Sequence, residues 1–347
     1  MIALTLSKRA LIGLAAITLA SCGSTAAPAS PPPSGSQAGK PAASQAAASV
    51  ASTAAGQKVV LAVPATNITA YAQLLPVDKG MFAQHGLSAT VQQMAPNTIP
   101  AALSSGDVQF TNATGAVGPA AVQGLPVRVI ALFQRYEAYS LVASAAVKTP
   151  ADLKGKRVAV PPIGGDNHEY VVAALKQGGL TEKDVQAFPM SASNQVAESL
   201  LAGNLDAGLL APPLTQQLAQ KGFHELTGPK LIELPSGGLG ASQQLLQQQP
   251  KLVEASLEAT IDGLLWMRDH PQDAVDYFAS KFSLTPDVAK AALDEMMDTL
   301  GFTFTDRDLQ PTIERTLAIA KSDKTVPVSA VYDLTAFNAL VQAKHLS

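Results

Sequence analysis

The sequence predicts an α/β protein with two similar lobes, and two observations support this. The first is a repeat: residues 61–64 (LAVP) and 158–161 (VAVP) each precede a polar loop, a helix-like stretch and a Gly-Leu pair. The same number of positions then separates each strand from a second glycine, Gly106 or Gly203. The second observation is that short apolar runs alternate with helical stretches, which favours mainly parallel sheets flanked by helices. Two similar lobes predict a cleft between them, and a cleft predicts a ligand.

The first copy opens on a β-branched run, which is typical of a buried parallel strand. A helix should follow from about residue 69 towards 80, with Pro76 kinking or ending it. The remaining predicted elements of this copy are strands at 88–93, 108–110 and 127–133, and helices at 99–105 and from 115 to 123.

The second copy repeats this order, and the last third of the chain departs from it. Predicted strands lie at 157–160, 185–188 and 207–210, and predicted helices at 169–177, 194–202 and up to 221. Amphipathic helical stretches then occupy 250–269, 273–282, 287–300, 306–321 and 328–341, without counterparts in the repeat.

Composition excludes several classes of protein. A chain of 347 residues with 47% hydrophobic residues can bury more than one domain-sized core. Its formal net charge is -3 and it has no basic cluster, so nucleic acid is not a predicted partner. The five histidines and one cysteine show no metal-ligand spacing, and no cofactor is predicted.

The N-terminus has the features of a targeting segment. Lys8 and Arg9 precede an apolar run at 10–20 that is too short to span a bilayer. Residues 19–23 (LASCG) resemble a bacterial lipobox, which implies that Cys22 carries lipid, palmitate included; an ordinary secretory cleavage site is the alternative. We therefore predict a signal peptide at 1–21. The Ala/Ser/Pro-rich segment that completes 22–57 is predicted to be a disordered tether on the extracytoplasmic face of the cell membrane.

Several motifs resemble those of substrate-binding lipoproteins of ABC importers, of the nitrate/sulfonate/taurine and NMT1/THI5-like type. The motifs are 79–87 (KGMFAQHGL), 102–108 (ALSSGDV), 152–160 (DLKGKRVAV) and 201–207 (LAGNLDA), and the resemblance covers about 58–290. It implies a periplasmic-binding-protein-like fold with two chain crossings, and lobes that close on a ligand. On this sequence, lobe 1 would be 58–143, lobe 2 would be 144–237, and 238–347 would return to lobe 1.

Four loops are placed to bind a ligand, because each follows the carboxyl end of a strand in the repeat. In the family the matching loops line the cleft. The candidate ligand contacts in or near these loops are Thr66, Asn67, Tyr71, Thr111, Asn112, Thr114, Arg135, Tyr136, Gly164, Gly165, Asp166, Asn167, His168, Ala211 and Pro212.

Each type of candidate also has a purely structural interpretation. Asn67 and Asp166 are natural helix caps. His168 in a first helical turn would hydrogen-bond or stack on a ligand, or else face solvent. Arg135 would pair with an anionic ligand, or with a surface carboxylate. The acidic Asp166 and Glu169 disfavour sulfonate or nitrate, so a neutral or partly cationic heterocycle, such as a pyrimidine-type precursor, is an equal alternative.

The predicted function is extracytoplasmic capture of a small-molecule solute. The resemblance implies delivery to an ABC permease and its ATPase by a monomeric, membrane-anchored lipoprotein that is not an enzyme. A membrane-anchored ligand sensor is one alternative. A second is a pyrimidine-precursor enzyme of the same fold, which depends on a cysteine-rich motif, whereas Cys22 is the one cysteine in this sequence.

Overall fold

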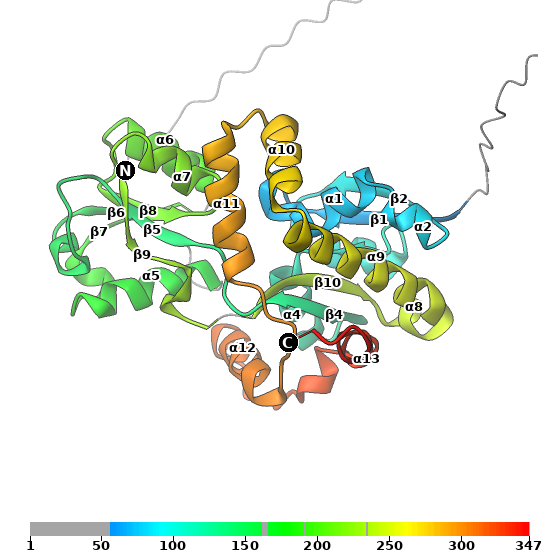
Figure 1. Ribbon diagram of the computed structural model, residues 1–347. Coiled ribbons are helices and arrows are strands. Elements are labelled where there is room, and N and C mark those ends of the chain that lie inside the picture. The colour runs from blue at the N-terminus through cyan, green and yellow to red at the C-terminus, as the bar shows by residue number, and fades with distance from the viewer. Residues whose placement is uncertain (1–55, 162–165, 191, 234, 347) are drawn as a thin grey trace, which may run out of the picture. The chain divides into compact units, whose positions relative to one another are not determined.

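A computed structural model describes residues 56–161, 166–190, 192–233 and 235–346, and it contains two five-stranded sheets (Figure 1). The first sheet has the order β2-β1-β3-β10-β4, with β1 (Gln57–Val63), β2 (Leu87–Gln93), β3 (Phe110–Thr111), β4 (Val127–Gln134) and β10 (Ser236–Ser242). The second has the order β7-β6-β8-β5-β9, with β5 (Ser140–Ala143), β6 (Arg157–Val160), β7 (Gln186–Pro189), β8 (Ala207–Leu210) and β9 (His224–Thr227). Cys22, the predicted signal peptide and the predicted tether up to residue 55 lie outside the described residues, and Gln57, predicted to end the tether, begins β1.

The predicted repeat is confirmed in the topology of the two sheets. β1, β2 and β3 correspond in order to β6, β7 and β8, and within each set the central strand pairs in parallel with both neighbours. The fourth strand of each sheet comes from across a crossing and is antiparallel to both of its neighbours: β10 in the first sheet and β5 in the second. Each lobe is therefore a mixed sheet whose fourth strand ties it to the crossing segments.

The chain crosses between the lobes twice, between Gln134 and Ser140 and between Leu231 and Ser236. The first crossing comes earlier than the predicted boundary at 143. The reason is that Ser140–Ala143 pairs with β8 and β9 and so belongs to the second lobe. The second crossing ends next to the predicted boundary at 237.

Helices cover both faces of the first sheet. One buried cluster joins the sheet to α1 (Tyr71–Asp78), α2 (Met81–Gln84), α9 (Pro250–Asp269), α10 (Pro271–Phe282) and α13 (Thr335–Ala343). The opposite cluster joins it to α3 (Ile99–Ser105), α4 (Thr114–Val122) and α12 (Asp306–Ile319). The short α8 (Gln243–Gln248) follows β10 and leads into α9.

Of the two predicted effects of Pro76, a kink or an end of the first helix, the end is wrong. α1 continues to Asp78 with Pro76 inside it, and the Pro76 ring packs against α9 at Gly263. A Cβ at Gly263 would lie 2.2 Å from Pro76 Cγ, so a glycine is required for this close approach.

The second lobe is smaller and has a helix layer on each face of its sheet. One cluster joins the sheet to α5 (Asp166–Gln177) and the other joins it to α6 (Ser193–Leu201) and α7 (Leu214–Ala219). Gly106 after α3 and Gly203 after α6 have φ of 84° and 71°. This left-handed conformation favours glycine, which explains why the repeat places a glycine at the end of each of these helices.

One helix, α11 (Pro286–Asp298), contacts both lobes. It packs against η1 (Ile68–Ala70) of lobe 1 and against α7 of lobe 2, and Figure 1 shows it standing between the two sheets. Four further short helices are η2 (Pro150–Leu153), η3 (Glu182–Asp184), η4 (Pro229–Leu231) and η5 (Val328–Ala330). Within the described residues, no helix is both long enough and apolar enough to span a membrane.

Candidate ligand-binding site

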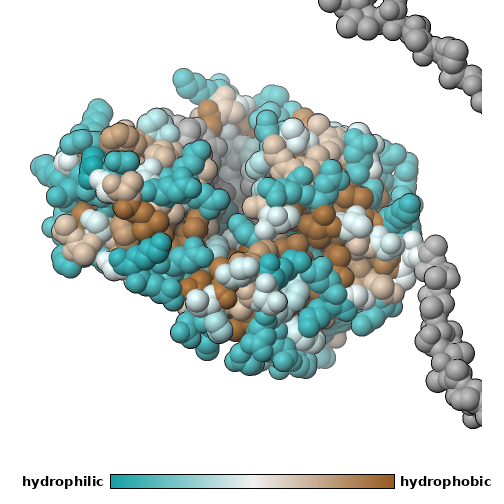
Figure 2. Space-filling view, turned by 90° about the horizontal axis from the view of Figure 1, so that it is seen from above, coloured by the Kyte–Doolittle hydropathy of each residue, from teal (hydrophilic) through white to brown (hydrophobic). Residues whose placement is uncertain are grey.

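A cleft of about 930 Å³ lies between the two lobes. Its lining includes residues of all four predicted loops, because the loops after β1, β3, β6 and β8 converge there. The two crossing segments, the region from α10 to α11, Pro96 and the start of α6 at Ala192–Asn194 also contribute to the lining. Figure 2 shows the molecule hollowed between the lobes. We call this hollow the main cleft.

On the lobe 1 side, two asparagines line the main cleft but differ in their hydrogen bonding. Asn67 caps η1, and its Oδ1 accepts hydrogen bonds from the Thr69 backbone N–H (2.9 Å) and hydroxyl (2.6 Å). Asn112 follows β3, and its Oδ1 is buried without a hydrogen-bond partner among the described residues. Thr114, at the start of α4, also lines the cleft.

On the lobe 2 side, His168 is 6% exposed, so the solvent-facing interpretation is wrong. Its Nε2 lies 3.0 Å from Glu182 Oε1. Because an ionised carboxylate only accepts hydrogen bonds, Nε2 carries the proton in this pair. The other ring nitrogen, Nδ1, is buried without a hydrogen-bond partner in the described parts of the chain, and Glu169 Oε1 lies 4.0 Å from it. A neutral His168 therefore presents Nδ1 as an acceptor.

Three other candidates lie outside the lining of the main cleft. Thr66 donates a hydrogen bond from Oγ1 to Gln93 Oε1 at 2.9 Å. Tyr71 is 3% exposed in the lobe 1 core, and burial raises the pKa of its phenol. Thr111 is buried, donates to the Ala62 carbonyl (2.8 Å) and accepts from the Ala113 N–H.

Arg135 binds protein carboxylates. Its guanidinium donates to Glu233 and, at 2.7 Å, to the Thr303 carbonyl, and it lies 3.8 Å from Asp308 Oδ1. The hydrogen bond to Glu233 raises the pKa of Arg135. Because Arg135 and Glu233 sit on different crossing segments, their pair joins the two crossings. Tyr136, the next residue, is half-buried and also lies outside the lining.

The structure thus brings about half of the candidates together. Gly164 and Gly165 lie outside the described residues, as does the side chain of Asp166, which begins α5. As ligand contacts, all of the candidates remain predictions. Those that line the main cleft are Asn67, Asn112, Thr114, Asn167, His168, Ala211 and Pro212.

Several lining residues are absent from the sequence prediction. Gln134 ends β4 and Glu137 lies on the first crossing, while Phe282 ends α10 and Met296 lies on α11. The crossings and α11 have no counterpart in the repeat, so the rule that places ligands at strand ends does not reach them. The resemblance to a two-crossing fold is the one signal that points to the crossing segments.

The main cleft is poor in charge. No lysine or arginine appears among its described lining residues, and Glu137 is the one carboxylate there. In the sequence, residues 162–166 and 191, which adjoin lining residues along the chain, include no lysine or arginine. Amides, hydroxyls and His168 supply most of its polar surface. Among the described residues, no cluster of His, Cys, Asp or Glu could hold a metal ion.

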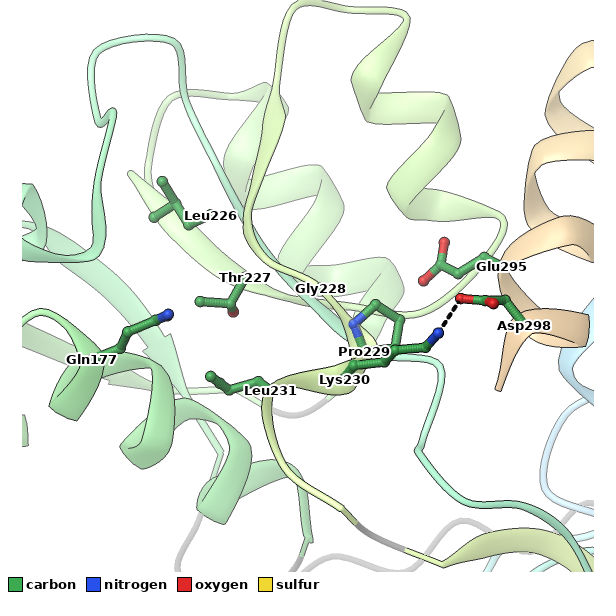
Figure 3. A pocket seen from close by; sticks show the side chains of 9 residues that line it. All are labelled: Gln177, Leu226, Thr227, Gly228, Pro229, Lys230, Leu231, Glu295 and Asp298. Atoms are coloured by element: carbon green, nitrogen blue, oxygen red, sulfur yellow. Dashed lines mark ion pairs between the residues drawn. The ribbon is translucent and has the colours of Figure 1, made fainter. Parts of the chain in front are cut away.

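A smaller pocket of about 420 Å³ lies where α11 meets lobe 2. Figure 3 shows Glu295 and Asp298 of α11 beside the segment from β9 to η4, with Lys230 Nζ 2.7 Å from Asp298 Oδ2. Glu295 accepts hydrogen bonds from Gln216 of α7 and, at 3.5 Å, from Ser140 of β5. We call the contact of Glu295 and Asp298 on α11 with Gln216, Ser140 and Lys230 the α11 junction.

Glu295 has an unusual environment for a carboxyl group. It is largely buried, and the nearby Glu225 adds charge repulsion; together these raise the pKa of Glu295 to about 7. Ser140 also donates to Glu225 at 2.9 Å, so the two carboxyls share this hydroxyl as a partner.

Two curated relatives are binding proteins. The riboflavin-binding protein RibY of Chloroflexus aurantiacus is 27% identical over 231 residues, which cover 63% of this chain and 65% of that protein. The taurine-binding periplasmic protein of Escherichia coli is 29% identical over 48% of this chain and 53% of its own length. The chain thus matches less than two thirds of the length of either relative.

Solved structures share the fold. The alkanesulfonate-binding protein SsuA from Xanthomonas axonopodis pv. citri, bound to MOPS, superposes with a TM-score of 0.67 at 19% identity, over 79% of this chain and 98% of that one. The desulfurization enzyme DszB, in complex with biphenyl-2-sulfinic acid, superposes with a TM-score of 0.64 at 16% identity, over 83% of this chain and 99% of that one. The fold therefore accommodates both binding proteins and an enzyme.

A family profile described as NMT1/THI5 like matches residues 67–274. This span begins within the loop after β1 and includes both crossings, all of lobe 2 and all of α9, so it contains most of the residues that line the main cleft. The chain belongs to the NMT1/THI5-like family.

Proposed function

We propose that this chain is an extracytoplasmic solute-binding protein that captures a small molecule in the main cleft and delivers it to an ABC importer. The observation that carries the proposal is the position of the cleft, between two lobes joined by two crossings. A ligand that contacts both lobes stabilises the closed arrangement, and the permease would recognise that arrangement by its different surface.

A binding role fits the chemistry of the main cleft better than catalysis does. Among the described lining residues of the main cleft, His168 is the one histidine, and its Nε2–H donates a hydrogen bond to Glu182. A nucleophilic mechanism needs a hydroxyl or thiol hydrogen-bonded to a base, and Nδ1, the ring nitrogen left to act as one, has no such partner among the described residues. The two curated relatives are binding proteins, which supports the same function.

Lobe closure provides the test of this function. Small-angle X-ray scattering of the purified protein should give a smaller radius of gyration at saturation with a bound solute, because the lobes approach each other. An unchanged radius of gyration with a solute that calorimetry shows to be bound would contradict the proposal. Loss of solute uptake on deletion of the gene would separate transport from ligand sensing, which predicts unchanged uptake.

The lipid anchor is a second part of the proposal. It rests on the lipobox-like residues 19–23, which lie outside the described residues. Cys22→Ser should move the protein from the membrane fraction to the soluble fraction, because lipid on this cysteine would hold it at the membrane. Retention of the variant in the membrane fraction would rule out the anchor and leave solute capture untouched.

A further inference from the structure

We infer that the main cleft selects an uncharged solute that donates hydrogen bonds to both lobes, to Asn112 from one side and to His168 from the other. This inference rests on the proposed function and specifies its ligand. It is independent of which importer receives the solute.

An anionic ligand would find no lysine or arginine among the described lining residues of the main cleft. A buried anion needs a charged partner or several hydrogen bonds to offset its desolvation. The described lining contains no lysine or arginine, and Arg135 is already bound to Glu233, to Asp308 and to a backbone carbonyl. The N-terminus of α4 at Thr114 supplies only the partial charge of a helix dipole, and Glu137 lies in the same lining.

The main cleft contains two buried acceptor atoms without hydrogen-bond partners among the described residues. Four buried side-chain atoms lack a hydrogen-bond partner among the described residues, and they belong to Asn112, His168, Gln216 and Ser256. Asn112 and His168 both line the main cleft, one from each lobe, whereas the other two residues do not. An unsatisfied buried acceptor costs on the order of 1–3 kcal/mol. A ligand that donates to both atoms removes this cost and links the lobes.

The direction of these hydrogen bonds follows from their surroundings. Glu182 fixes the His168 proton on Nε2, which leaves Nδ1 as an acceptor in the neutral ring. Asn112 presents its carbonyl oxygen. Both atoms are shielded from solvent, so a ligand reaches them only if these side chains move, and rotamer changes of this kind are common on binding. The ligand must therefore carry N–H or O–H groups.

Part of the lining of the main cleft is apolar. Ile68, Phe282, Leu284 and Met296 line the same cleft. Phe282 ends α10 and Met296 lies on α11. A ring or hydrocarbon portion fits against such side chains, so the ligand class is an uncharged solute with both donor groups and an apolar portion.

Matched pairs of probes test this inference. Each pair has one skeleton and differs in charge: riboflavin and riboflavin 5′-phosphate, uridine and uridine 5′-phosphate, butanesulfonamide and butanesulfonate. Isothermal titration calorimetry of the purified chain should give at least one uncharged binder, with a dissociation constant at least about tenfold below that of its charged partner. Tighter binding of a charged member, or no binding of any uncharged member, would overturn the inference.

Variants then locate the binding. Asn112→Ala and His168→Phe should each weaken the uncharged binder about tenfold or more, because each removes one acceptor. Asn112→Ser provides a second variant if Asn112→Ala melts at a lower temperature. Asn338→Ala and His270→Phe are the controls, since Asn338 is exposed on α13 and His270 stacks on Trp266 outside the lining. Equal affinities in all of these variants would remove both residues from the site.

The outcomes separate the ligand class from the function. A charged member that binds tightest and reduces the radius of gyration would contradict the ligand class and leave solute capture standing. A bound solute that leaves the radius of gyration unchanged would contradict solute capture by lobe closure itself.

Discussion

The main cleft and the α11 junction both lie where the lobes meet, yet they differ in charge. The cleft is lined by amides, hydroxyls and apolar groups, with Glu137 as its one described carboxylate. The junction contains Glu295 with a raised pKa, beside the ion pair of Lys230 and Asp298. We therefore expect the main cleft to select its ligand by hydrogen-bond donors and acceptors. We expect protonation of Glu295 to affect the contact of α11 with lobe 2.

This separation matters because the two effects can be measured independently. A change in the cleft should alter affinity and ligand class with little change in pH dependence. A change at the α11 junction should alter how stability depends on pH, with little change in ligand class. Substitutions can therefore perturb the main cleft and the α11 junction separately.

Placing a positive charge in the main cleft should produce the largest effect. Gln217 on α7 is half-buried and lines the cleft. Gln217→Lys should weaken an uncharged ligand by about tenfold or more and strengthen its charged partner, because a partly buried ammonium favours an anion. Calorimetry with the matched probe pairs measures both changes.

Gln220→Lys is the control for this substitution, since Gln220 is exposed at the end of the same helix and lies outside the lining. An unchanged preference in Gln217→Lys would mean that the cleft does not choose its ligand by charge.

Glu295 should give the protein a specific pH dependence. Its pKa in the folded protein is about 7, above the ordinary value of 4.5, so the folded state holds the proton more tightly. The associated stability is fully present below about pH 4.5 and is lost as the pH rises through about 7. Glu295→Gln should remove this loss, which we expect to be about 3 kcal/mol in the free energy of unfolding.

Thermal melting of wild type and variant between about pH 5 and pH 8 checks this prediction. Asp294→Asn is the matched control, because Asp294 lies on the same helix, exposed and paired with Lys290 at 2.6 Å. If Glu295→Gln and wild type lose stability in parallel over this range, the α11 junction is not the proton-sensitive contact.

The exposed ion pair at the α11 junction should matter least. Lys230 and Asp298 have side chains that are 54% and 68% exposed. Exposed pairs contribute roughly 0.2–1 kcal/mol, so Lys230→Ala should change the free energy of unfolding by less than about 0.5 kcal/mol at physiological salt. Denaturant titration measures it, and a loss as large as that expected for Glu295 would mean that charge pairing, and not burial, holds α11 against lobe 2.

Sequence reasoning predicts the features that the repeat encodes. The alternation of strands and helices in each copy, and the placing of four loops after strand ends, follow from matched strands and glycines such as Gly106 and Gly203. Family resemblance adds the two crossings, although the first lies earlier than the predicted boundary because Ser140–Ala143 pairs inside lobe 2.

The remaining features depend on contacts between distant residues, which a local pattern does not contain. Arg135 follows a central strand and looks free to bind an anion, but Glu233 lies 98 positions away in the chain and binds it. Tyr71 lies near a predicted loop and is buried in the lobe 1 core. His168 gains its partner Glu182 from η3, and the pKa of Glu295 is raised first by its burial and then by the charge of Glu225 on lobe 2.

The central claim is that an uncharged solute closes the two lobes by contacting both. Because Cys22 is the one cysteine in the sequence, Cys22→Ser provides a cysteine-free background for spin labels. Labels at Gln123→Cys on lobe 1 and Lys183→Cys on lobe 2, both exposed positions, report the distance between the lobes by pulsed electron paramagnetic resonance. The account predicts a shifted and narrower distance distribution at saturation with the uncharged binder, which Asn112→Ala with His168→Phe abolishes at the same probe concentration. An unshifted distribution with the binder in place would contradict it.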